Sequence, residues 1–238
     1  MNKAKFDPDD SRWQRLYQLG SIAALIVVLF IPLQVVIFMA WPPPTTAQGY
    51  FTTFQNNPVI GLLNLDLLLI IDQVLGIVIL MALYAALRRT AEVGMMIALV
   101  LGIVVAATYF ASNPAFNMLM LGHQYAAAVA DVQRAMYLAA GESMLAIYNG
   151  TAFHVSYILG ALVGTLIGVV MWRSEVFSRV TASMAILANI ISLGLYVPVV
   201  GLYLSIFSVL FLEIFYILVA RRLWQLGHYE SQLAPQPA

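Results

Sequence analysis

The distribution of apolar residues divides this 238-residue chain into six long hydrophobic runs separated by short polar segments. A helix needs about 20 mostly apolar residues to cross a bilayer. The runs have this length and cover residues 19–40, 61–87, 94–111, 149–172, 179–197 and 201–220. The pattern therefore predicts an all-α fold, a polytopic membrane helix bundle with six transmembrane helices between residues 19 and 222.

The polar segments between the runs contain residues that end or begin helices. The sequence WPPPTT at 41–46 ends the first run, because proline cannot continue a helix. Asn57 followed by Pro58 is typical of a helix start, with an N-cap and then proline at the first helical position. The sequence SNP at 112–114 ends the third run, and VPVVG at 197–201 predicts a short turn between the fifth and the sixth.

The composition indicates a lipid environment. Hydrophobic residues make up 62% of the chain and charged residues only 9%, whereas soluble domains carry about 25% charged residues. A water-facing surface would need more charge, so the lipid bilayer is the first predicted partner. The formal net charge of +0 gives no electrostatic reason for a nucleic-acid partner. We expect the first run to be retained, since it is longer than the apolar core of a signal peptide.

Basic residues predict the orientation of the bundle. Of the 11 lysines and arginines, all but Arg134 fall on one side of a six-span topology. They are Lys3, Lys5, Arg12, Arg15, Arg88, Arg89, Arg173, Arg179, Arg221 and Arg222. Cytoplasmic loops carry an excess of these residues. We therefore expect the tails 1–18 and 223–238 to lie on the cytoplasmic side of a cell's inner (plasma) membrane.

The segment 115–147 falls on the opposite, outer side and is rich in alanine. Tyr125, Val129, Val132 and Met136 recur in it at helical spacing. This stripe predicts an outer amphipathic helix. Because the segment has little basic charge, we expect its apolar face to pack on the protein and not on lipid headgroups.

Small residues recur every four positions in two of the runs. They are Gly94, Ala98, Gly102 and Ala106 in one run, and Gly160, Gly164 and Gly168 in the other. Such stripes let two helix backbones approach closely. We expect packing within the chain, and the alternatives are a homodimer face or a contact with other membrane subunits.

Polar residues within the apolar runs collect near the predicted outer side. If Arg88 marks the cytoplasmic end of the second run, the outer edge of the hydrocarbon lies near Leu68. Asp66 is then near the outer interface, and Asp72 lies ~6 Å inside this edge. The sequence predicts an outer ligand-binding pocket formed by Asp66, Asp72, Gln73, Arg134, Glu142, His154 and Tyr157.

Two further hypotheses concern this pocket. In the alternative to ligand binding, the polar groups only hydrogen-bond one another, and Arg134 neutralises one carboxylate. We also hypothesise that Asp72 and His154 lie close together and titrate as a pair.

One carboxylate is predicted deeper in the membrane. Glu213 precedes Arg221 by eight residues, or ~12 Å along a helix. A carboxylate at this depth is a functional candidate. The alternative is a protonated carboxyl group bonded to Asn189 or to a serine.

Motifs for catalysis are scarce. The three histidines, His123, His154 and His228, are predicted at different depths, so they cannot form a three-histidine metal site. The chain has no cysteine, and we find no phosphate-binding loop and no nucleophile with a paired base. We therefore predict no catalytic residue, metal or cofactor. The favoured hypothesis is a non-enzymatic binder of a small ligand or lipid, or an accessory subunit; the alternatives are a proton-coupled small-molecule transporter and a lipid-modifying enzyme.

Several short segments between residues 60 and 225 carry a family resemblance. They are GLLNLDLLL, ALYAALRR, YFASNPAF, GTAF with ILGALVG, RSEVFSRVTA and ARRLWQL. In these segments the chain resembles bacterial six-helix membrane proteins of the domain of unknown function 4386 family. The resemblance implies a six-helix integral membrane architecture in a bacterial membrane. It brings no established activity, so it assigns no residue a role.

Overall fold

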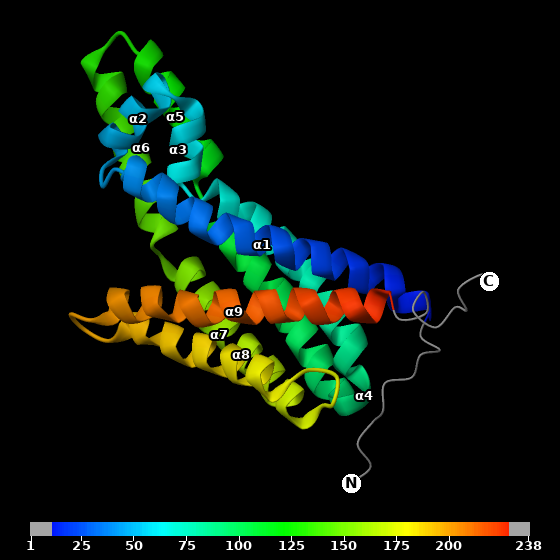
Figure 1. Ribbon diagram of the computed structural model, residues 1–238. Helices are drawn as coiled ribbons and strands as arrows, with labels where there is room; N and C mark the ends of the chain where they lie inside the picture. The colour runs from blue at the N-terminus through cyan, green and yellow to red at the C-terminus, as the bar shows by residue number, and fades with distance from the viewer. Residues whose placement is uncertain (1–10, 229–238) are drawn as a thin grey trace. The chain divides into compact units, whose positions relative to one another are not determined.

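The computed structural model describes residues 11–228, and within them the secondary structure is helical without strands (Figure 1). The elements are η1 Ser11–Trp13, α1 Gln14–Ala40, α2 Ala47–Asn56, α3 Pro58–Asn64, α4 Leu67–Ser112, α5 Ala115–Ala127, α6 Asp131–Tyr148, α7 Thr151–Arg173, α8 Arg179–Ser192, η2 Leu193–Tyr196 and α9 Gly201–Gly227. The predicted all-α class is therefore confirmed. Lys3, Lys5 and most of both predicted tails lie outside the described residues.

Several helices begin and end at the prolines and asparagines that the sequence analysis identified. Helix α1 ends at Ala40, directly before the proline-rich segment, and α4 ends at Ser112, before Asn113 and Pro114. The side chain of Asn57 accepts hydrogen bonds from the backbone N–H groups of the second and third residues of α3, at 3.0 and 3.2 Å. Asn57 is thus the predicted N-cap, and Pro58 occupies the first position of α3.

Helix α4 folds back on itself at Ala91. This residue has φ −155° and ψ 78°, which is not helical. A Cβ atom built on Gly102 would collide with the side chain of Leu80, although in a straight helix 22 residues would separate the two by ~33 Å. The stretch therefore consists of two antiparallel helices, which Figure 1 shows as neighbouring arms.

Five helical segments of the described chain are long and apolar enough to cross a membrane. They are Gln14–Ala40, Leu67–Ala127, Asp131–Arg173, Arg179–Tyr196 and Gly201–Gly227. Length and hydropathy thus indicate a membrane protein, as the apolar runs predicted. The second of these segments contains the fold-back at Ala91.

The single outer helix predicted over 115–147 is wrong. The structure has two helices there, α5 and α6, because the chain becomes extended at Ala128 and Ala130. Arg134 Nε donates to the Ala128 carbonyl at 3.0 Å and so stabilises the bend. The predicted packing of the apolar stripe holds only for Tyr125, whose ring lies 5.4 Å from that of Phe51. It is wrong for Val129 and Val132, which are 90% and 72% exposed.

The described chain forms two compact units. Unit 1 comprises residues 11–29, 74–105 and 158–228, and unit 2 comprises 30–73 and 106–157. In unit 1, Cβ atoms on Gly164 and Gly168 would collide with Asn189 and Ile186 of α8. These two glycines therefore serve close packing within the chain, as expected for the stripe in α7. In the same unit, α8 and α9 lie side by side (Figure 1).

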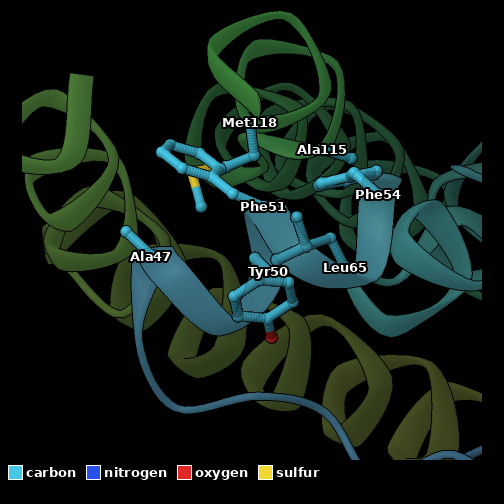
Figure 2. Packing of buried hydrophobic residues seen from close by; sticks show 7 residues of the cluster. All are labelled: Ala47, Tyr50, Phe51, Phe54, Leu65, Ala115 and Met118. Atoms are coloured by element: carbon cyan, nitrogen blue, oxygen red, sulfur yellow. The ribbon is translucent and has the colours of Figure 1, made fainter. Parts of the chain in front are cut away.

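Unit 2 has an aromatic core on α2. Phe51 and Phe54 are at most 1% exposed, and Figure 2 shows them with Leu65 of the α3–α4 connection and Met118 of α5. Glycines make room for the rings: a Cβ atom on Gly141 of α6 would lie 2.8 Å from Phe51 Cζ. Burying each phenylalanine stabilises unit 2 by about 2–3 kcal/mol.

Candidate functional site

The candidate site is built on an interruption of the second apolar run. The sequence predicted one continuous helix over 61–87, but α3 ends at Asn64 and α4 begins at Leu67. Between them, Asp66 has φ 61° and ψ 36°, which is the left-handed region. This conformation costs a non-glycine residue about 1–2 kcal/mol, and aspartate tolerates it better than most.

Side chains from other elements stabilise the freed backbone. The carbonyl of Leu63 accepts a hydrogen bond from Gln34 Nε2 of α1 at 3.2 Å. The carbonyl of Asn64 accepts one from the Tyr50 hydroxyl of α2 at 3.5 Å, and the next carbonyl, that of Leu65, accepts one from Asn113 Nδ2 at 2.8 Å. Three consecutive carbonyls are thus satisfied by side chains. Because backbone groups in apolar surroundings need partners, these contacts maintain the interruption.

Two tyrosines bind the carboxylate of Asp66. The hydroxyl groups of Tyr148 in α6 and Tyr109 in α4 both donate to Asp66 Oδ2, and the second bond is 3.4 Å long. Within residues 11–228, Asp66 forms no ion pair with a basic side chain. The carboxylate is therefore held by neutral donors alone, which orient it without neutralising its charge.

The electrostatics of the site reflect this arrangement. Asp66 and Tyr50 both lie outside the segments long and apolar enough to cross a membrane. Burial raises the pKa of the Asp66 carboxyl above its ordinary value, and the two tyrosine donors oppose this rise. Burial, and then the negative charge of Asp66, raise the pKa of Tyr50 to about 12. At neutral pH the Tyr50 hydroxyl is therefore a hydrogen-bond donor.

Two amide oxygens at the interruption lack hydrogen-bond partners. Gln34 is 6% exposed and Asn64 is 2% exposed. Their side-chain oxygens, Gln34 Oε1 and Asn64 Oδ1, are buried and accept no hydrogen bond within the described chain. An unsatisfied buried acceptor costs about 1–3 kcal/mol. The orientation of Gln34 is fixed, since its Nε2 must face the Leu63 carbonyl.

The structure gives two predicted pocket residues other roles. Glu142 is exposed, and its Oε1 accepts a hydrogen bond from the Ala47 N–H at 2.9 Å. It thereby caps the start of α2, where a negative charge is favourable. Arg134 is bonded to the Ala128 carbonyl and forms no ion pair within residues 11–228. The predicted neutralisation of a pocket carboxylate by Arg134 is therefore wrong.

The other predicted pocket residues also belong to unit 2. Asp72 lies near enough to act electrostatically on Tyr109, the tyrosine that donates to Asp66. Gln73 is partly buried. His154 is exposed, and its ring and that of Tyr157 lie 5.4 and 5.8 Å from the ring of Phe153. The pairing of Asp72 with His154 stays a prediction.

Glu213 lies in α9 of unit 1, apart from these groups in sequence. Its Oε2 is buried and has no hydrogen-bond partner among the described residues. Asn189 bonds instead to the Ala185 carbonyl of its own helix, at 2.7 Å. The predicted bond between Glu213 and Asn189 or a serine is therefore wrong.

Sequence reasoning missed the three tyrosines of the site. Tyr109 and Tyr148 donate to the Asp66 carboxylate, and Tyr50 donates to the Asn64 carbonyl. They are separated from Asp66 by between 16 and 82 positions, and tyrosine is common near membrane interfaces, so no local signal distinguishes them. Within residues 11–228, no group of three or more histidine and carboxylate side chains is placed to hold a metal ion. Comparisons of the chain with protein families, with curated proteins and with solved structures gave no match.

Proposed function

We propose that the chain is a six-span membrane protein with both termini on the cytoplasmic side, as in the domain of unknown function 4386 family. The fold-back at Ala91 supports this count, because it divides one of the five candidate segments into two antiparallel helices. The distribution of basic residues supports the orientation.

Cysteine labelling tests the topology directly, since the native chain has no cysteine. A membrane-impermeant maleimide added to intact cells should react with single cysteines at Gln48 and Gln133. It should not react with cysteines at Glu92 and Ser174. Labelling of the second pair from outside would contradict the orientation.

We propose further that the protein binds a small polar ligand in unit 2 and catalyses no reaction. The observation that carries this proposal is Asp66, a left-handed residue whose carboxylate is held by two tyrosines without a basic partner. Strained backbone, an unneutralised carboxylate and unsatisfied amide oxygens all reduce stability, so their coincidence supports a binding role.

Transport of the ligand is a second candidate. The interruption between α3 and α4 supports it, because transporters use interrupted helices to present backbone and side-chain groups to substrates. A flux assay in proteoliposomes distinguishes transport from binding alone.

Native mass spectrometry tests the binding proposal. The full chain and the Asp66→Asn variant would be released from nanodiscs after incubation with a mixture of amino acids, polyamines and quaternary amines. Asparagine tolerates the left-handed region and keeps the shape of aspartate. We expect an added mass on the parent protein that is at least tenfold weaker on the variant. An adduct of equal occupancy on both proteins would contradict ligand binding at Asp66.

A further inference from the structure

We infer that the Asp66 site binds a small monovalent cation. This inference rests on the proposed function and names the class of ligand. The site is defined here by Asp66, Gln34 and Asn64, with the tyrosines that donate to the interruption, and all of these residues belong to unit 2.

The first argument is the chemistry of the atoms that lack partners. Gln34 Oε1 and Asn64 Oδ1 are acceptors, and both residues are more than nine-tenths buried. Asp66 uses only Oδ2 in its two hydrogen bonds, so Oδ1 adds a third available acceptor. The buried side-chain atoms without partners at the interruption are both oxygens, and a cation or a protonated amine pairs with such acceptors.

The second argument is proximity. The Gln34 amide is bonded to the Leu63 carbonyl, directly before Asn64, and Asp66 follows two residues later. The left-handed conformation at Asp66 turns the chain at this point, so the three residues flank one short backbone interruption. Interrupted helices with exposed oxygen groups are a known way to coordinate monovalent cations inside membrane proteins.

The third argument is charge. The ionised Asp66 carboxylate contributes one negative charge, and the two amides are neutral. Arg134 is engaged at the Ala128 carbonyl and brings no competing positive charge. One negative charge balances one monovalent cation. Calcium takes six to eight oxygen ligands with several carboxylates, and no cluster of three acidic or histidine side chains exists within residues 11–228.

Thermal unfolding of the full chain in nanodiscs tests this inference. Melts would be compared in sodium, potassium or ammonium chloride and in N-methyl-D-glucamine chloride, whose cation is too bulky, at an equal concentration of about 100 mM. At least one small cation should raise the Tm by about 3 °C or more, because a ligand that binds only the folded state stabilises it. Magnesium and calcium chloride at matched ionic strength should not reproduce the increase.

Variants assign the effect to the site. Asp66→Asn should abolish the cation-dependent increase in Tm, and Gln34→Met should shift its midpoint at least tenfold to higher concentration. Glu92→Gln is the matched control, because it removes one carboxylate from an exposed position of unit 1. It should keep the full increase. If Gln34→Met fails to fold, Asp66→Asn alone decides the assignment.

Two results would overturn the inference. One is the same Tm in N-methyl-D-glucamine chloride as in all three small-cation salts. The other is an undiminished increase in the Asp66→Asn variant. If native mass spectrometry nevertheless showed an organic adduct that depends on Asp66, ligand binding at this site would still be supported. In that case only the inference of an inorganic cation would be rejected.

Discussion

Polar side chains find hydrogen-bond partners in different ways in units 1 and 2. In unit 1 the helices are packed through glycine, and the Asn189 side chain bonds to a carbonyl of its own helix, that of Ala185, at 2.7 Å. In unit 2 a helix is interrupted, and side chains from α1, α2 and the α4–α5 connection bond to the freed carbonyls. Regular helices satisfy their own backbone groups, whereas an interrupted one must recruit partners from elsewhere in the fold.

The carboxylates of the two units illustrate the same difference. Glu213 in unit 1 has a buried oxygen without a hydrogen-bond partner in the described chain. Asp66 in unit 2 is held by Tyr109 and Tyr148. Asp66, unlike Glu213, is surrounded by oriented polar side chains, and this is why the proposed site is placed in unit 2.

The largest expected effect tests whether the aromatic core stabilises unit 2, on which the difference between the two units depends. Phe51→Ala removes a ring that is 0% exposed. The cavity and the lost transfer free energy should destabilise the protein by about 3–5 kcal/mol. Thermal melts in detergent measure the loss. Phe116→Ala is the control, because this ring is 60% exposed, and equal melts for the two variants would show that the core is not essential.

Glycine packing is the corresponding test for unit 1. Gly164→Leu would force a side chain against Asn189, whose amide is fixed on the Ala185 carbonyl. Separation of α7 from α8 should cost about 3 kcal/mol. The control is Gly76→Leu, since a Cβ atom there meets nothing within 4 Å. An unchanged melt for Gly164→Leu would contradict the close contact between these helices.

Alkaline pH should destabilise unit 2 specifically, because Tyr50 belongs to the polar network of this unit. Burial and the charge of Asp66 raise the pKa of Tyr50 to about 12 in the folded protein, whereas a tyrosine in an unfolded chain titrates near pH 10. The unfolded chain therefore loses this proton first as the pH rises. Stability that is fully present below pH ~10 should fall by on the order of 2 kcal/mol as the pH approaches 12.

The comparison of Tyr50→Phe with the parent protein isolates this effect. Between about pH 9 and pH 11.5, the Tm of the variant should decrease by less than the Tm of the parent protein. Tyr203→Phe is the control, because Tyr203 is 73% exposed and should not alter the pH profile. Parallel pH profiles for Tyr50→Phe and the parent would contradict the burial of an unionised hydroxyl group at this position.

The smallest expected effect concerns the start of α3. Asn57→Ala removes the N-cap whose side chain bonds to the N–H groups of Val59 and Ile60. The loss should be about 1 kcal/mol, visible as a small decrease in Tm. Asn56→Ala is the neighbouring control, because Asn56 is the exposed last residue of α2. A larger effect at Asn56 than at Asn57 would contradict the capping assignment.

Local sequence alone determined the helical class, the apolar segments and most helix ends. Runs of apolar residues and prolines act over a few positions, so their consequences can be read without the fold. The end of α1 at Ala40, the cap at Asn57 and the close contacts of Gly164 and Gly168 all followed from such signals.

Only the tertiary structure decided the candidate site. No glycine or proline marks the interruption at Asp66, so the sequence NLDLLL reads as continuous helix. The groups that compensate the interruption come from distant positions: Gln34 is 29 residues from the carbonyl it binds, and Tyr148 is 82 residues from Asp66. A left-handed aspartate persists because these contacts together outweigh its local conformational cost, and such a balance exists only once the chain has folded.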